Sequence, residues 1–97
     1  MYFISSTYAV AKDRIEALLP AHRAWLDRHY AAGDFLMSGR LDPPTGGFML
    51  ARAMPRSDLE RLLESDPFRQ QGCLTHQIQA LVPLRVHETW PPLETLA

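Results

Sequence analysis

The order in which strand-like and helix-like patterns follow one another is the feature that most constrains this fold. Aromatic and β-branched residues favour strands, whereas apolar residues repeated every three or four positions favour helices. These patterns predict a strand, a helix, two strands, a second helix and a last strand, at residues 2–9, 12–32, 35–41, 48–53, 57–65 and 74–87. Residues 42–47 are rich in proline and glycine and predict a hairpin loop between the second and third strands.

This order of elements is that of the ferredoxin-like α+β fold. Right-handed crossovers then predict an antiparallel sheet in the order 4-1-3-2, with both helices on one face. The other face carries apolar residues and has no cover within the chain, so we expect a homodimer that packs sheet against sheet as a dimeric α+β barrel. We expect one domain over residues 1–97, with a core to about residue 87 and an irregular tail at 88–97.

The helix ends carry conflicting signals. Asp13 is a plausible N-cap of the first helix, and Gly33 is a natural stop. Pro20 would break a helix interior, so the helix either begins near Leu19 after a separate turn or kinks at the proline. A Ser-x-x-Glu capping box at residues 57–60 is expected to open the second helix.

Two polar residues, His22 and Asp66, occupy helix positions at which an apolar side chain would face the core. The apolar neighbours at helical spacing are Ile15, Leu18, Leu19, Trp25 and Leu26 around His22, and Leu59, Leu62 and Leu63 before Asp66. Burying an imidazole or a carboxylate is costly unless the group is paired or neutralised. If the two helices lie side by side, we expect these residues to meet each other or a ligand.

Both residues also have a structural interpretation. His22 is compatible with a core histidine that a backbone carbonyl satisfies. Asp66 precedes Pro67, which ends the second helix and makes the pair a good N-cap and first residue of a short helical turn, with Phe68 packing beneath. The two roles of Asp66 are compatible, because a capping carboxylate has a second oxygen that can orient an imidazole.

The predicted topology brings dispersed residues to one edge of the sheet, close to His22. Candidate ligand-binding residues at this edge are Ser38, Gly39, Arg40, Phe68 and His76. Arg40 is either a surface charge of the hairpin or a clamp for an anion, and Ser38 either contacts a ligand or packs in its strand. The glycines, including those at 46–47, more often serve turn geometry. His76 is either a ligand contact or an ordinary strand histidine.

Composition excludes several classes of protein. The formal net charge is −1 with no basic run, so we expect no nucleic-acid partner. Cys73 is the single cysteine, so no disulfide can form within the chain, and we expect the protein in a reducing cytoplasm. We expect the thiol of Cys73 to pack in the core without a chemical role. Residues 2–10 are too short and polar for a membrane span or signal peptide. His22 and His29 lie about 10 Å apart along a helix, too far to share one metal ion, and no cofactor motif is present, so we expect neither metal nor cofactor.

Several short motifs together resemble the YciI-like (YCII) family over about residues 1–87. They are Pro20-Ala21-His22 before an apolar helix, residues 33–39 ending in Ser-Gly, Gly46-Gly47 before a strand, and Asp66-Pro67-Phe68 with Gly72 shortly after. The resemblance implies a dimeric α+β barrel with a His–Asp pair in a pocket, here His22 and Asp66. One relative removes chloride from a hydroxylated aromatic ring, and related barrels include muconolactone isomerases and cofactor-free oxygenases. Arg40 stands where many relatives have proline, which leaves the substrate class open.

The resulting hypothesis is cofactor-free proton transfer on a small organic molecule, by elimination or isomerisation, as in a lyase or an isomerase. His22 would act as general base and then acid, and Asp66 would fix its tautomer and raise its basicity. Arg40 is a candidate to stabilise a developing enolate or a substrate carboxylate, so the substrate is either neutral or an anion. The alternative is a non-catalytic dimer that binds a ligand or a partner protein, in which the His–Asp pair is structural. An exposed imidazole edge in a cavity favours the enzyme.

Overall fold

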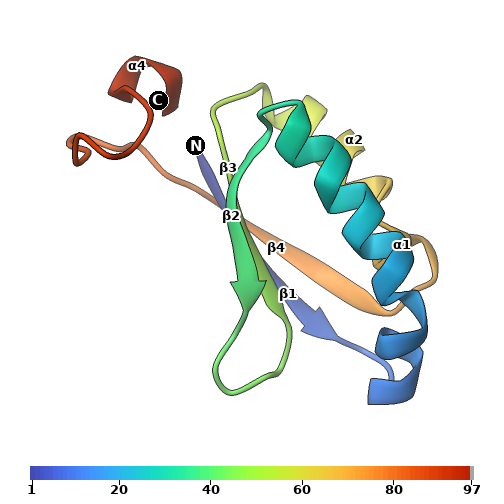
Figure 1. Cartoon of the computed structure of the whole chain (residues 1–97). Coiled ribbons are helices and arrows are strands. Elements are labelled where there is room, and N and C mark those ends of the chain that lie inside the picture. Colours follow the sequence, from blue (N-terminus) through green and yellow to red (C-terminus); the bar gives the residue numbers. More distant parts are fainter. Residues whose placement is uncertain (97) are drawn as a thin grey trace.

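The computed structural model describes residues 1–96, so residue 97 of the predicted tail lies outside the described residues. In chain order the elements are β1 (Tyr2–Tyr8), α1 (Lys12–Ala31), β2 (Phe35–Arg40), β3 (Gly47–Ala51), α2 (Arg56–Glu64), α3 (Pro67–Gln70), β4 (Leu74–Ala80) and α4 (Leu93–Leu96) (Figure 1). No helix within the described residues is both long and apolar enough to cross a bilayer.

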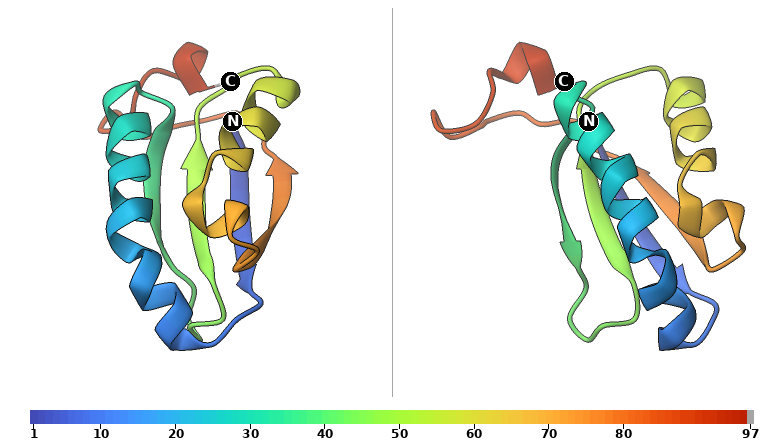
Figure 2. Two further views of the ribbon diagram at one scale, coloured as in Figure 1. Left: turned by 90° about the vertical axis from the view of Figure 1, so that its right-hand side faces the viewer. Right: turned by 45° about the vertical axis from the view of Figure 1, so that its right-hand side comes forward.

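The sheet has the predicted topology. Its strands lie in the order β2-β3-β1-β4, and each neighbouring pair is antiparallel. The long helices α1 and α2 lie on the same side of the sheet, and the segment after β4 extends away from them (Figure 2). This arrangement confirms the ferredoxin-like α+β fold and brings the ends of β2, β3 and β4 to the cavity described below.

Two apolar clusters fill the space between the helices and the sheet. The larger cluster consists of Ile4, Trp25, Phe35, Met49, Ala51, Leu59 and Leu63. The smaller one consists of Ile15, Phe68, Cys73 and Leu74. Strand alternation places Phe3 and Phe48 on the opposite face of the sheet. Their rings stack there, with centroids 6.0 Å apart. This face has no cover from α1 or α2.

Helix α1 begins at Lys12, as the pattern over residues 12–32 predicts, and the alternative start near Leu19 is not observed. The helix runs without interruption from Lys12 through Pro20, although proline removes one backbone hydrogen bond. Its first turns bury Ile15 in the smaller cluster, and this packing explains why the helix continues across the proline. Asp13 lies in the first turn and does not cap it, because the capping position is Ala11. Gly33 ends the helix as predicted, with a left-handed φ of 79°.

The predicted cap of the second helix and the predicted end of the last strand are wrong. The Ser-x-x-Glu segment at 57–60 makes no side-chain cap, since α2 begins one residue earlier, after Pro55. The last strand ends at Ala80 rather than near residue 87. Ala80 pairs with Tyr2 and Leu81 N–H donates to Met1 C=O, so β1 offers no partner farther on. The predicted irregular tail contains the short helix α4, whose Leu96 is buried.

Candidate active site

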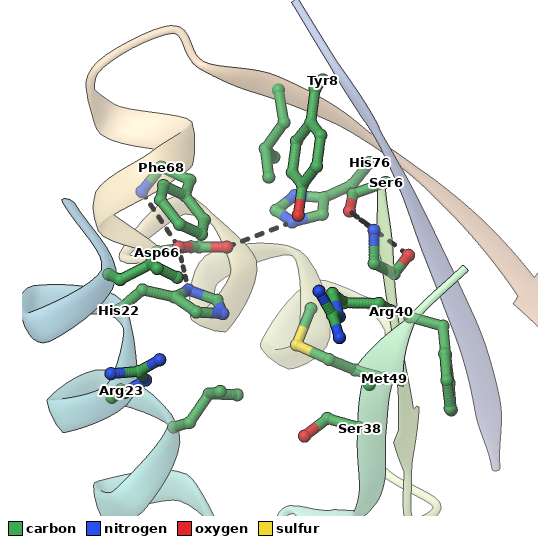
Figure 3. A pocket seen from close by; sticks show the side chains of 16 residues that line it. Ser6, Tyr8, His22, Arg23, Ser38, Arg40, Met49, Asp66, Phe68 and His76 are labelled. Atoms are coloured by element: carbon green, nitrogen blue, oxygen red, sulfur yellow. Dashed lines mark hydrogen bonds and ion pairs between the residues drawn. The ribbon is translucent and has the colours of Figure 1, made fainter. Parts of the chain in front are cut away.

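A cavity of about 490 Å³ lies between α1, α3 and the helix-facing side of the sheet (Figure 3). The seven residues predicted for the site all line it: His22, Ser38, Gly39, Arg40, Asp66, Phe68 and His76. Residues from four strands and two helices, far apart in the sequence, therefore meet around one space. The cavity also has polar lining residues that the sequence did not indicate, namely Ser6, Tyr8 and Arg23.

Asp66 serves both as a helix cap and as a partner of His22. Its backbone is extended, with φ −62° and ψ 122°, because the following residue is Pro67. One carboxylate oxygen, Oδ1, accepts the Phe68 backbone N–H at 3.0 Å and lies 3.0 Å from His22 Nδ1. The structure thus combines the two roles that the sequence left open.

The His22 ring is held in place while one edge stays accessible. It stacks on Phe68 with ring centroids 4.3 Å apart and on Trp25 at 5.7 Å. The side chain is 17% exposed and lines the cavity. When Nδ1 donates its proton to Asp66, Nε2 carries a lone pair, and no group of residues 1–96 hydrogen-bonds to it. This atom can accept a proton from a molecule in the cavity.

His76 faces the same carboxylate from the sheet. Its Nε2 lies 3.3 Å from Asp66 Oδ2, a distance typical of an ion pair, and both side chains are 1% exposed. The atoms are not aligned for a hydrogen bond, so both ring nitrogens of His76 and Asp66 Oδ2 lack a hydrogen-bond partner within the described residues. The sequence left His76 open between a ligand contact and an ordinary strand histidine, and it did not indicate a second imidazole beside Asp66.

The surroundings of Asp66 keep it ionised. Burial by itself raises the pKa of this carboxyl, but contacts with His22 and His76, the charge of His22 and the Phe68 N–H together lower the pKa from 3.8 to about 2. The site therefore contains a buried carboxylate at neutral pH, placed between two imidazoles. Such a carboxylate stabilises positive charge that develops on His22 when it takes up a proton.

Glycines at the hairpin allow the strands to approach closely. A Cβ atom on Gly46 would lie 1.7 Å from the backbone oxygen of Ser6, so no larger residue fits there. Ser6 Oγ accepts the Gly47 N–H at 3.0 Å. A Cβ on Gly39 would meet the Phe48 ring at 2.9 Å. These glycines serve the packing of the strands that form the cavity wall.

A second histidine–aspartate pair, which was not predicted from the sequence, lies two turns farther along α1. His29 Nδ1 lies 2.9 Å from Asp34 Oδ2, and Arg52 donates to Asp34 Oδ1 at 3.0 Å. This pair is not among the residues that line the cavity. Within residues 1–96, no group of three or more His, Cys, Asp or Glu side chains is placed to hold a metal ion.

Comparisons with known proteins agree with the fold. Residues 1–79 match the family model of the YCII-related domain. No curated protein matches the sequence. Among solved structures, the chain is similar to 5-chloro-2-hydroxyhydroquinone dehydrochlorinase from Burkholderia phenoliruptrix in complex with 2,5-dihydroxybenzoquinone. The TM-score is 0.68 at 19% identity, over 84% of this chain and 93% of that chain. At this identity the likeness establishes a shared fold.

Proposed function

We propose that this chain, which belongs to the YCII-related domain family, is a small enzyme that moves a proton on a small organic molecule through His22 and Asp66. The observation that carries the proposal is the 3.0 Å contact between His22 Nδ1 and Asp66 Oδ1, with Nε2 facing the cavity. A positioned imidazole of this kind contributes roughly 10² to 10⁴ in rate.

In the proposed reaction, His22 Nε2 takes a proton from an acidic C–H or O–H of the substrate. The electron pair of the broken bond stays on the substrate as an enolate or phenolate. In an elimination, these electrons expel a leaving group as its anion, and His22 then loses its proton to water. In an isomerisation, His22 returns the proton to another atom of the substrate.

Elimination is the form that the structural neighbour supports, since that protein is a dehydrochlorinase. Both forms share the first proton transfer, and both use the ionised Asp66 to stabilise the imidazolium. A structural role for the pair explains the cap on Phe68 but leaves the accessible Nε2 edge without a purpose.

Hydrogen–deuterium exchange tests the shared step without a known product. The protein is incubated in D₂O with small enolisable acids and hydroxylated chloroarenes, and NMR follows both deuterium uptake and loss of the substrate. We expect His22→Ala to abolish exchange. Asp66→Asn should lower it by about 10² or more, within the range of general acid–base assistance.

His29→Ala is the matched control, because His29 lies on the same helix and also bonds to an aspartate. This variant should keep the wild-type exchange rate. Equal loss in the His22 and His29 variants, or exchange that survives in folded His22→Ala, would overturn the proposed function.

We also propose that the chain works as a homodimer in the cytoplasm, with the uncovered sheet face packed against a second copy. Phe3 and Phe48 stack on this face, where apolar surface favours association. Light scattering at micromolar concentration should give about twice the chain mass of 11.0 kDa. A stably folded monomer would contradict the dimer.

A further inference from the structure

We propose that the substrate is a one-ring organic anion whose carboxylate or phenolate oxygen binds between Arg23 and Arg40. This inference rests on the proposed function and names the class of molecule on which the site acts. Arg23 comes from α1, directly after His22, and Arg40 comes from the opposite wall on β2 (Figure 3). An anion held between them would lie beside the accessible edge of His22.

Most polar acceptors of the cavity are either hydrogen-bonded to the protein or buried. Asp66 accepts from Phe68 and contacts His22, Ser6 exchanges hydrogen bonds with Gly47, and the Ser38 hydroxyl lies 2.6 Å from the Tyr30 hydroxyl. A ligand therefore finds few acceptors that it could donate to. Apart from His22 Nε2, which the proposed reaction uses as a base, the buried acceptors without a hydrogen-bond partner in residues 1–96 are Asp66 Oδ2 and a ring nitrogen of His76, and both side chains are only 1% exposed.

The free polar groups are mainly donors. Within residues 1–96, the guanidinium groups of Arg23 and Arg40 and the hydroxyl of Tyr8 line the cavity without a hydrogen bond or ion pair to the protein. A guanidinium has five N–H donors and no acceptor, and it binds carboxylate with two parallel hydrogen bonds. His76 adds a side chain that is 1% exposed and has no hydrogen-bond partner in the same cavity. This set of groups matches a ligand rich in acceptors.

The charge of the cavity also favours an anionic ligand. The whole chain has a formal net charge of −1, so a positive cavity is a local feature and does not follow from overall composition. The carboxylate of the cavity, Asp66, is 1% exposed and already surrounded by His22, His76 and a backbone N–H. The two arginines thus keep an unbalanced positive charge toward the cavity, which favours an anion.

The remaining walls of the cavity are apolar and favour a ligand with a carbon skeleton. Apolar side chains of Leu19, Leu26, Met49 and Leu74 line the cavity together with the Phe68 ring. A volume of about 490 Å³ lies in the range of small-molecule sites. An inorganic anion would leave these walls without a contact, whereas a ring covers them. With the anion at the arginines, the same cations also stabilise charge that develops when His22 removes a proton.

Calorimetric and NMR titration of the purified chain with benzoate tests this inference, with benzamide as the neutral probe of the same shape. We expect benzoate to bind about tenfold or more tightly than benzamide, and Arg40→Gln and Arg23→Gln each to weaken benzoate binding by about fivefold to tenfold. Arg40→Lys keeps the charge but loses the paired hydrogen bonds, so its effect should be intermediate. Circular dichroism checks that the variants are folded.

Arg28→Gln is the matched control, since Arg28 lies on α1 and is exposed but does not line the cavity. It should leave benzoate binding unchanged. Equal binding of benzoate and benzamide, no binding of benzoate, or equal effects of the Arg28 and Arg40 variants would overturn the inference. His22→Ala separates the two proposals, because it should abolish deuterium exchange but still bind benzoate. Preference for the anion in a protein that exchanges no proton would refute the proposed function alone.

Discussion

His22 and His29 lie two turns apart on α1, and each directs its Nδ1 atom to an aspartate, at 3.0 Å from Asp66 and 2.9 Å from Asp34. The surroundings of the two carboxylates differ. Asp34 lies five residues from His29, is 16% exposed and also binds the guanidinium of Arg52. Asp66 lies 44 residues from His22, is 1% exposed and has His76 beside its second oxygen.

The difference shows that a His–Asp pair is not by itself a site. Arg52 is a permanent cation, so it balances the charge of Asp34, and these contacts tie the end of α1 to the end of β3. Asp66 has only imidazoles and a backbone N–H around it, so its charge is available to a protonated His22. Under the proposed function, the accessible edge of the His22 imidazole in the cavity distinguishes its chemical role from the structural role of His29.

The largest effect is expected from removing the two carboxylates. Asp66→Ala strands the Phe68 N–H and the imidazoles of His22 and His76 in a buried place, and should lower the free energy of unfolding by about 3 kcal/mol. Asp34→Ala should cost about 1 kcal/mol, because its partners remain partly hydrated. Urea unfolding at one fixed protein concentration measures both values. Equal losses of unfolding free energy would show that the two pairs stabilise the fold to the same extent.

Acid titration sharpens the comparison on Asp66. Its pKa is lowered from 3.8 to about 2 in the folded chain. A carboxyl with a lowered folded pKa stabilises the fold above its unfolded pKa, and this contribution is lost as the pH falls through the folded value. The contribution of Asp66, about 2 kcal/mol of unfolding free energy, should therefore disappear between about pH 4 and pH 2.

Asp66→Asn provides the comparison for the acid titration, because its amide does not ionise. The gap in unfolding free energy between wild type and this variant should narrow as the pH falls over the same window. Urea unfolding at several pH values measures the gap. A gap that stays constant from pH 4 to pH 2 would show that the charge of Asp66 does not stabilise the folded chain.

The fold could be predicted because its signals are local. Alternation and helical spacing depend on neighbours in the sequence, and the order of these patterns leaves few topologies. The ends of elements depend on distant partners instead. β4 stops at Ala80 because β1 begins opposite it, and α1 continues through Pro20 because Ile15 finds a buried cluster. Neither partner is visible in the local pattern.

The site was only partly predictable for a related reason. His22 and Asp66 interrupt apolar stripes, which makes a polar residue conspicuous in the sequence. Arg23 is an exposed helix residue like several others, and only the placement of β2 opposite α1 brings it to the same cavity as Arg40. The Asp34–Arg52 contact depends on the pairing of β2 with β3, whose register the sequence alone did not supply.

The smallest effect is expected from Arg52→Gln, which removes the cation of the second pair. Arg52 is 38% exposed at its side chain, so its ion pair with Asp34 is hydrated and screened by salt. We expect a loss of about 0.5 kcal/mol in the free energy of unfolding at low salt, and less at high salt. Urea unfolding at two salt concentrations measures this loss. Benzoate binding and deuterium exchange should stay at wild-type values, because Arg52 does not line the cavity. If Arg52→Gln lowered the free energy of unfolding as much as Asp66→Ala, Asp34 would behave as a buried charge that needs its cation. The two histidine–aspartate pairs would then not differ in this respect.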